Sequence, residues 1–164
     1  MDNKLNDTDQ LHEEIIQLKK QVQEYESLIK DISAPIIPSI VPETILIPIT
    51  GRLYAERFEM IIAKILEASY QEEVSNVIID FTAISKKEIG DIEVFGKYIR
   101  NLTSALDMMG IQTLYAGFTP AVTQVLVQSG LNIIQELQTF STFRTALQYL
   151  MREKGLEFKR GLSL

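Results

Sequence analysis

The sequence contains no cysteine and a single histidine, His12. Without cysteine, neither a disulfide framework nor a thiolate that binds metal or attacks a substrate is possible. A serine nucleophile would also need a neighbouring base, and His12 falls at a solvent-facing position of a predicted helix. We therefore expect that the protein is not an enzyme and has no catalytic residue, metal site or cofactor.

Long apolar runs and clusters of basic residues are also absent. Prolines and charges interrupt every apolar stretch before the roughly 18 residues that span a bilayer, and the first residues lack the basic and apolar regions of a secretory signal. The net charge is −6, and Lys86-Lys87 is the only notable basic pair in the domain interior. Neither G-x-G-x-x-G nor G-x-x-x-x-G-K-[ST] occurs. We therefore expect a cytoplasmic protein that binds neither nucleic acid nor membrane.

The first part of the chain carries a regular apolar pattern, with spacings that alternate between four and three residues. Most positions between are polar or charged, and Asp9 is a candidate N-cap. The pattern predicts a disordered segment over 1–8 and a coiled-coil helix over 9–33 that forms a homodimer. Two alternatives are docking to a helix of another protein and packing against the chain's own domain. The predicted interface residues are Leu11, Ile15, Leu18, Val22, Tyr25, Ile29 and Ile32.

After Pro35, which cannot continue a helix, predicted strands and helices alternate. Two strands over 36–41 and 44–49 form an edge hairpin. The following predicted elements are a helix over 54–71, a strand over 74–80, a helix over 89–109, a strand over 111–116, a helix over 120–129, a short strand at Ile133-Ile134 and a helix over 141–153. This order predicts one α/β domain over 34–154, with a mixed, largely parallel sheet flanked by helices. The C-terminal tail over 155–164 is weakly patterned, and we expect it to fray.

Asp80 ends the apolar strand Val77-Ile78-Ile79, at the edge where open parallel sheets carry ligands. A phosphoacceptor or metal site would need acidic residues at other strand ends, and the 44–49 strand offers only Thr50 there. Acid–base catalysis with Glu88 or Asp91 is a second alternative. The favoured interpretation is structural, with Asp80 accepting hydrogen bonds from backbone amides in the turn that follows.

Several segments together resemble STAS domains, the fold of anti-sigma-factor antagonists. The turn Asp80-Phe81-Thr82-Ala83-Ile84 resembles the family's D-[IV]-[ST]-[GA]-[VL] element. Three further segments resemble the C-terminal STAS domain of RsbR-type stressosome proteins: Ser33-Ala34-Pro35-Ile36-Ile37-Pro38, Gly117-Phe118-Thr119-Pro120-Ala121-Val122 and Leu126-Val127-Gln128-Ser129-Gly130-Leu131. The resemblance implies a domain that pairs with other STAS domains and whose phosphorylation by a switch kinase controls signalling.

The chain departs from this family pattern at both phosphoacceptor positions. Counting from Asp80 without gaps, Glu88 matches the acidic residue and Ile89 falls on the Ser or Thr acceptor, followed by Gly90 and Asp91. The second RsbR-type acceptor falls on Val125, after Thr119-Pro120 and Thr123. Since neither Ile nor Val can carry phosphate, we expect both switches to be lost at these positions. Thr82, Ser85 and Thr123 are the remaining nearby hydroxyls, and Thr82 is expected to cap its turn.

Two functions follow as hypotheses. In the first, the chain is a non-enzymatic, RsbR-like component or modulator of a stressosome-type assembly, with RsbR- or RsbS-like STAS partners and a switch kinase as a possible further partner. It carries the residues 1–33 in place of the sensory domain that RsbR-type proteins place before the STAS domain. In the second, the STAS domain binds a small ligand or nucleotide, with loop 81–91 at the rim of the pocket.

Overall fold

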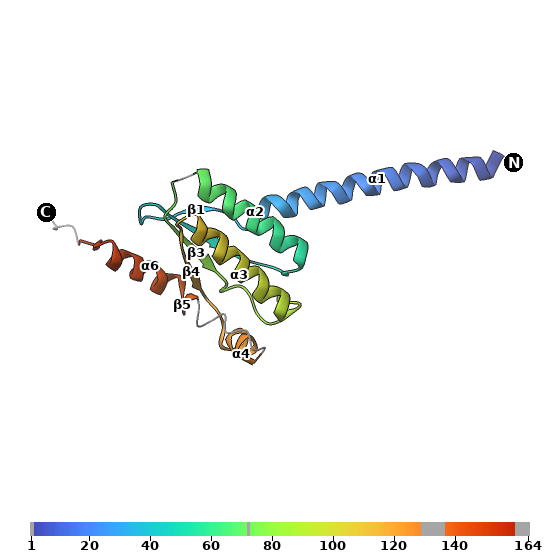
Figure 1. Ribbon diagram of the computed structural model, residues 1–164. Coiled ribbons are helices and arrows are strands. Elements are labelled where there is room, and N and C mark those ends of the chain that lie inside the picture. Colours follow the sequence, from blue (N-terminus) through green and yellow to red (C-terminus); the bar gives the residue numbers. More distant parts are fainter. Residues whose placement is uncertain (1, 72, 129–136, 160–164) are drawn as a thin grey trace. The chain divides into compact units, whose positions relative to one another are not determined.

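The computed structural model describes residues 2–71, 73–128 and 137–159, with side chains described from Asp7 onward. The chain divides into two compact units, Met1–Ser33 and Ala34–Leu164. Figure 1 shows the helices and strands of each unit. In the part of the chain that is described, no helix combines the length and the apolar character needed to cross a bilayer.

The first unit is the single helix α1 (Asp2–Ile32). It begins well before Asp9, so the predicted disordered segment over 1–8 is wrong for residues 2–8, and Asp9 lies inside the helix rather than at its N-cap. No glycine or proline occurs before Pro35 to interrupt the helix. At its end Ser33 donates its hydroxyl hydrogen to the Ile29 carbonyl over 2.6 Å. Ala34 takes a φ of 47°, outside the helical conformation that Pro35 disfavours at this residue.

The second unit contains a five-stranded sheet in the order β1-β2-β3-β4-β5. Only β1 runs antiparallel to its neighbour, which confirms the mixed, largely parallel sheet and its edge hairpin. The strands are β1 (Ile37–Pro38), β2 (Thr44–Pro48), β3 (Asn76–Asp80), β4 (Gln112–Ala116) and β5 (Gln138–Phe140). The strand predicted at Ile133-Ile134 falls outside the described residues, and β5 was not predicted from the sequence.

Helices cover both faces of the sheet, and α2 and α3 lie side by side (Figure 1). One apolar core joins the sheet to α2 (Ala55–Gln71), α3 (Ile92–Met108) and α4 (Pro120–Gln128). A smaller core on the other face includes Ile78, Leu114, Ala146 and Leu150 and packs the sheet against α6 (Phe143–Glu153). The strand β3 is buried along its length up to Asp80, as its continuous apolar sequence predicts.

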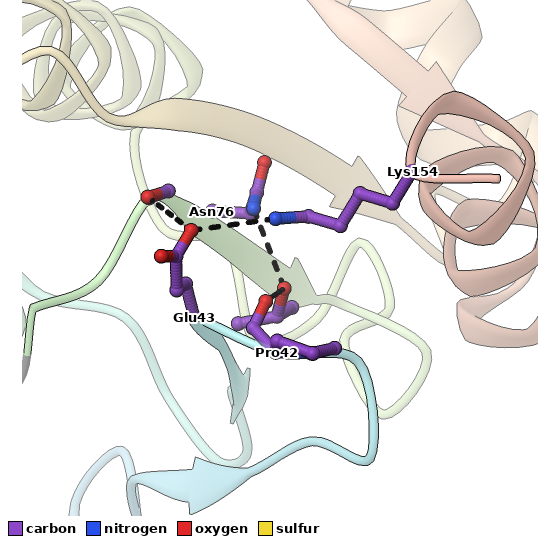
Figure 2. Close-up of polar contacts among 6 residues, drawn as sticks. Pro42, Glu43, Asn76 and Lys154 are labelled. Carbon is purple, nitrogen blue, oxygen red and sulfur yellow. Dashed lines mark hydrogen bonds and ion pairs between the residues drawn. The ribbon is translucent and has the colours of Figure 1, made fainter. Parts of the chain in front are cut away.

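The amino ends of β2 and β3 are held by a polar cluster that also reaches the end of α6 (Figure 2). Ser75 donates its hydroxyl hydrogen to the Glu43 carboxylate over 2.8 Å, and the Lys154 Nζ atom lies 3.5 Å from the same oxygen. The hydrogen bond from Ser75, followed by the Lys154 charge, lowers the pKa of Glu43. Asn76 donates to the Thr44 hydroxyl over 3.4 Å. These contacts fix the register at this edge and leave the opposite, carboxyl-end edge to carry a site.

Candidate functional site

The loop after β3 begins with a turn that the Asp80 carboxylate closes. Its Oδ1 atom accepts the Thr82 amide over 2.9 Å and the Thr82 hydroxyl over 2.5 Å. The turn continues with a hydrogen bond from the Ile84 amide to the Phe81 carbonyl over 2.8 Å. Phe81 and Ile84 are both buried, so their side chains anchor the turn in the core. This geometry agrees with the structural interpretation of Asp80.

Gly117, directly after β4, packs against that turn so closely that no side chain fits. Its φ is +78°, and a Cβ atom there would lie 2.3 Å from the Thr82 hydroxyl oxygen and 2.5 Å from the Thr82 amide nitrogen. L residues rarely adopt this conformation, and the Thr82 nitrogen cannot move far because it donates to Asp80. The loops after β3 and β4 are therefore locked together.

A second tight turn follows over residues 85–88. The Glu88 Oε2 atom accepts the Ser85 amide over 2.7 Å and the Ser85 hydroxyl over 2.5 Å. These hydrogen bonds favour the charged carboxylate, and the hydroxyl of Ser85 is the largest cause of the lowered pKa of Glu88. Glu88 is thus engaged within its own loop, and its backbone carbonyl accepts the Leu53 amide over 2.8 Å.

Ile89, which the ungapped count from Asp80 predicts to occupy the acceptor position, is part of the core. Its side chain is 8% exposed and belongs to the same apolar cluster as the sheet. Its backbone forms a parallel bridge with Leu53. The helix predicted from residue 89 instead begins at Ile92, because Asp91 is the N-cap and accepts the amides of Glu93 and Val94 over 2.8 and 3.1 Å.

The second acceptor region lies at the start of α4. Thr119 acts as a cap, since its hydroxyl oxygen accepts the Val122 amide over 3.3 Å and its carbonyl accepts the Thr123 amide over 2.9 Å. Pro120 occupies the first helical position, where its missing amide hydrogen is not needed. Thr123 and Val125 are half-buried.

The structure brings these two regions together around one cavity of about 280 Å³. Its described lining contains no hydroxyl and only one charged group, an ammonium. The lining residues are Lys86, Ile89, Gly90, Ile92, Val122 and Val125. Ile89 and Val125, the residues at the two predicted acceptor positions, thus face the same space. The two regions lie about 35 residues apart in the sequence, but they meet because β3 and β4 are adjacent parallel strands and the loops after them lie at the same edge of the sheet.

Several residues of this edge were not identified from the sequence as site residues. Gly117 and Val122 occur in a family motif, Ile92 lies within the helix predicted over 89–109, and Leu53 precedes the helix predicted over 54–71. No group of three or more acidic or histidine side chains that could hold a metal ion occurs among the residues described. The hydroxyls of Thr82 and Ser85 are exposed, but each is bound to a carboxylate of its own turn.

Comparison with known proteins identifies the family of the chain. The STAS domain model matches residues 31–146. The chain is 25% identical over 114 residues to the RsbT co-antagonist protein RsbRB of Bacillus subtilis, covering 70% of this chain and 39% of that protein. It is 26% identical over 155 residues to the co-antagonist RsbRD of the same organism, covering 93% of this chain and 50% of that protein. The chain thus spans half or less of the length of these relatives.

Solved structures agree on the fold. A variant of RsbS from Moorella thermoacetica matches with a TM-score of 0.61 at 16% identity, covering 75% of this chain and 98% of that one. The anti-sigma factor antagonist SpoIIAA in its unphosphorylated form matches with a TM-score of 0.55 at 24% identity, covering 77% and 100%. With the family model spanning most of the second unit, the chain belongs to the STAS domain family.

Proposed function

We propose that this protein is a non-enzymatic STAS regulator that assembles with RsbR- or RsbS-like STAS proteins and does not itself switch by phosphorylation. The proposal is supported by the similarity to RsbT co-antagonist proteins. The observation that carries it is the burial of Ile89 at the position of the family's acceptor. Phosphate adds charge and strong acceptor oxygens, and neither a buried isoleucine nor a valine can receive it.

In this proposal the chain provides a binding surface and takes up subunit positions in an assembly, while its partners are the proteins that become phosphorylated. The contacts at the edge support that division, because the carboxylates of Asp80, Glu88 and Asp91 are all bound to groups of their own loop or helix. They are therefore committed to holding the loop in place. A helix N-terminus would favour phosphate, but the Asp91 carboxylate already occupies that place at α3.

Two experiments test the proposal. Mixing the full chain with an RsbS-like STAS protein from the same organism, followed by light scattering on a sizing column, should give a complex larger than either component. A mass that never rises above that of the separate components would contradict the assembly proposal.

Incubation of the same mixture with the cognate switch kinase and labelled ATP tests the lost switch. We expect label on the RsbS-like partner, which serves as the positive control, and none on this chain. Label on this chain that disappears in Thr82→Val, Ser85→Ala or Thr123→Val would overturn the proposal and identify the residue.

A second candidate function is binding of a small molecule, and the 280 Å³ cavity favours it. A lining of apolar side chains with one lysine suits a small apolar molecule that carries an anionic group better than it suits a nucleotide. A thermal shift with short-chain fatty acids in wild type that is absent in Val125→Phe, which would fill the cavity, would support this function. No shift across fatty acids and nucleotides would count against it.

A further inference from the structure

The apolar positions of α1 form a stripe that remains exposed in the single chain. The side chains of Leu11, Leu18 and Ile32 are 56%, 52% and 64% exposed, and the other four predicted interface residues are exposed as well. Their alternating spacings define a heptad repeat. We propose that two copies of the chain pair through α1 as a parallel, in-register coiled coil. This proposal rests on the self-association that the sequence predicts for the helix.

The residue types at the two core positions of the heptad support this arrangement. The spacing assigns Ile15, Val22 and Ile29 to position a, and all three are β-branched. It assigns Leu11, Leu18, Tyr25 and Ile32 to position d, so leucine fills the first two of these four positions. β-Branched residues at a with leucine at d favour parallel two-stranded coiled coils over higher oligomers.

The charges beside the stripe distinguish parallel from antiparallel pairing. In a parallel, in-register pair, Glu14 at position g lies beside the partner copy's lysine 19 at position e, and symmetry makes this contact twice. An antiparallel pair that sets Leu11 against Ile29 instead places two copies of Lys19 side by side and leaves Ile32 without an apolar partner. A shift by one heptad brings Lys19 beside a glutamate, but it leaves Leu11 unmatched. Only the parallel arrangement satisfies both the apolar stripe and the charges.

The orientation has a consequence for the STAS domains. In a parallel pair, both chains leave the coiled coil at the same end, and the two copies of Ala34 start roughly 10 Å apart, the usual distance between packed helix axes. In an antiparallel pair the two copies of Ala34 would lie at opposite ends of the coiled coil, roughly 30 to 40 Å apart at 1.5 Å per residue. The parallel arrangement therefore delivers two STAS domains together to any assembly they join.

Because the chain has no cysteine, single cysteines provide a direct test. In the full-length protein, Leu11→Cys and Ile32→Cys should each form a disulfide-linked dimer on mild oxidation, since each residue faces its own copy in a parallel pair. Glu13→Cys, at the outward position f, is the matched control and should stay largely uncrosslinked. A dimer by light scattering in which neither Leu11→Cys nor Ile32→Cys crosslinks would overturn the orientation alone. A monomer would overturn the self-association itself.

A charge exchange gives an independent readout without cysteine. Lys19→Glu places Glu14 beside a glutamate in the parallel pair and should weaken dimerisation severalfold, and Glu14→Lys in the same chain should restore it. Lys20→Glu makes the same charge change on the outer face and loses only an exposed pair with Glu24 at 4.0 Å, so its effect should be small. Unchanged dimerisation in Lys19→Glu, or no restoration by Glu14→Lys, would contradict the parallel arrangement.

Discussion

The loop after β3 has two halves that differ in how they relate to the STAS pattern. The anchoring half, Asp80–Ile84, resembles the family's turn, and its Asp80 and Thr82 hold the loop against Gly117. The acceptor half, Ser85–Asp91, forms a turn and a helix cap, and it has Ile89 at the position where the ungapped count from Asp80 predicts the acceptor. That isoleucine is buried.

The difference indicates which features of the loop depend on phosphorylation and which do not. The hydrogen bonds of both halves are made within the chain, so the backbone path needs no phosphate and no acceptor hydroxyl. Replacing a surface hydroxyl by a buried apolar side chain removes the chemistry while it adds to the core. In this protein the loop is therefore held as a structural element by its own hydrogen bonds.

The largest effect is expected from Gly117→Ala, which breaks the anchoring half. The new Cβ atom would overlap the Thr82 amide and hydroxyl in a backbone conformation that alanine disfavours, so we expect a loss of about 4 kcal/mol in the free energy of unfolding. Gly110→Ala is the matched control, because Gly110 has a φ of +74° and no atom lies within 4 Å of the position that a Cβ would take there. It should cost only about 1 kcal/mol.

Denaturant unfolding followed by circular dichroism measures both variants. Equal losses in Gly117→Ala and Gly110→Ala would mean that the contact with Thr82 does not hold the loops together. The anchoring half would then be no more constrained than an ordinary turn.

A somewhat smaller effect is expected from Ile89→Ser, which restores a hydroxyl to the acceptor half. Ile89 is almost fully buried beside a cavity, so losing its side chain should lower the free energy of unfolding by about 2 to 3 kcal/mol. Ile89→Val keeps the apolar character and should cost about 1 kcal/mol. If Ile89→Ser were as stable as the wild type, the position would be a surface acceptor site that had merely changed residue.

Asp91→Ala should have a still smaller effect, because it removes only the N-cap of α3. The two amides that Asp91 accepts would lose their partner, which typically costs about 1 kcal/mol. Asp91→Asn keeps an accepting oxygen and should lose only a few tenths of a kcal/mol. Chemical denaturation distinguishes the two variants, and equal losses would show that the charge, not the hydrogen bond, stabilises the helix start.

Much of the fold could be predicted from the sequence because its signals are local. The continuous apolar run of β3 and the amphipathic pattern of α3 each identify their element, and Pro35 marks the end of α1. Boundaries were less predictable where a side chain decides them. Asp91 caps α3 and moves its start past Ile89, and a capping aspartate cannot be told from an ordinary polar residue without the backbone around it.

The candidate site was only partly predictable, because its two regions meet in space and not in sequence. The role of Asp80 followed from turn chemistry, which acts between near neighbours. The burial of Ile89 depends on its bridge to Leu53, and the shared cavity depends on the approach of α4, both of which are tertiary contacts. The close approach of Gly117 to Thr82 belongs to the same class, since a glycine motif alone does not say which atoms lie against it.

The smallest effect concerns the pH dependence of the acceptor half. Hydrogen bonds from Ser85 hold the pKa of Glu88 below its ordinary value near 4.5, with a minor contribution from the charge of Lys87. A carboxylate whose pKa is lowered by folding stabilises the fold above its unfolded pKa, and this contribution is lost as the pH falls through the folded pKa. Stability from this turn should therefore be present at neutral pH and disappear in acid.

Ser85→Ala tests this dependence, because it removes the hydroxyl that is the largest cause of the lowered pKa. It leaves the hydrogen bond from the backbone amide of residue 85 to Glu88 in place. An NMR titration of the Glu88 carboxyl should show its pKa rising part of the way toward the ordinary value, and the stability difference from wild type should shrink as the pH falls below about 4. Lys87→Gln is the comparison variant and should raise the pKa less, since charge between exposed groups is screened. A larger shift in Lys87→Gln than in Ser85→Ala would mean that surface charge, and not the hydrogen-bonded turn, keeps Glu88 ionised.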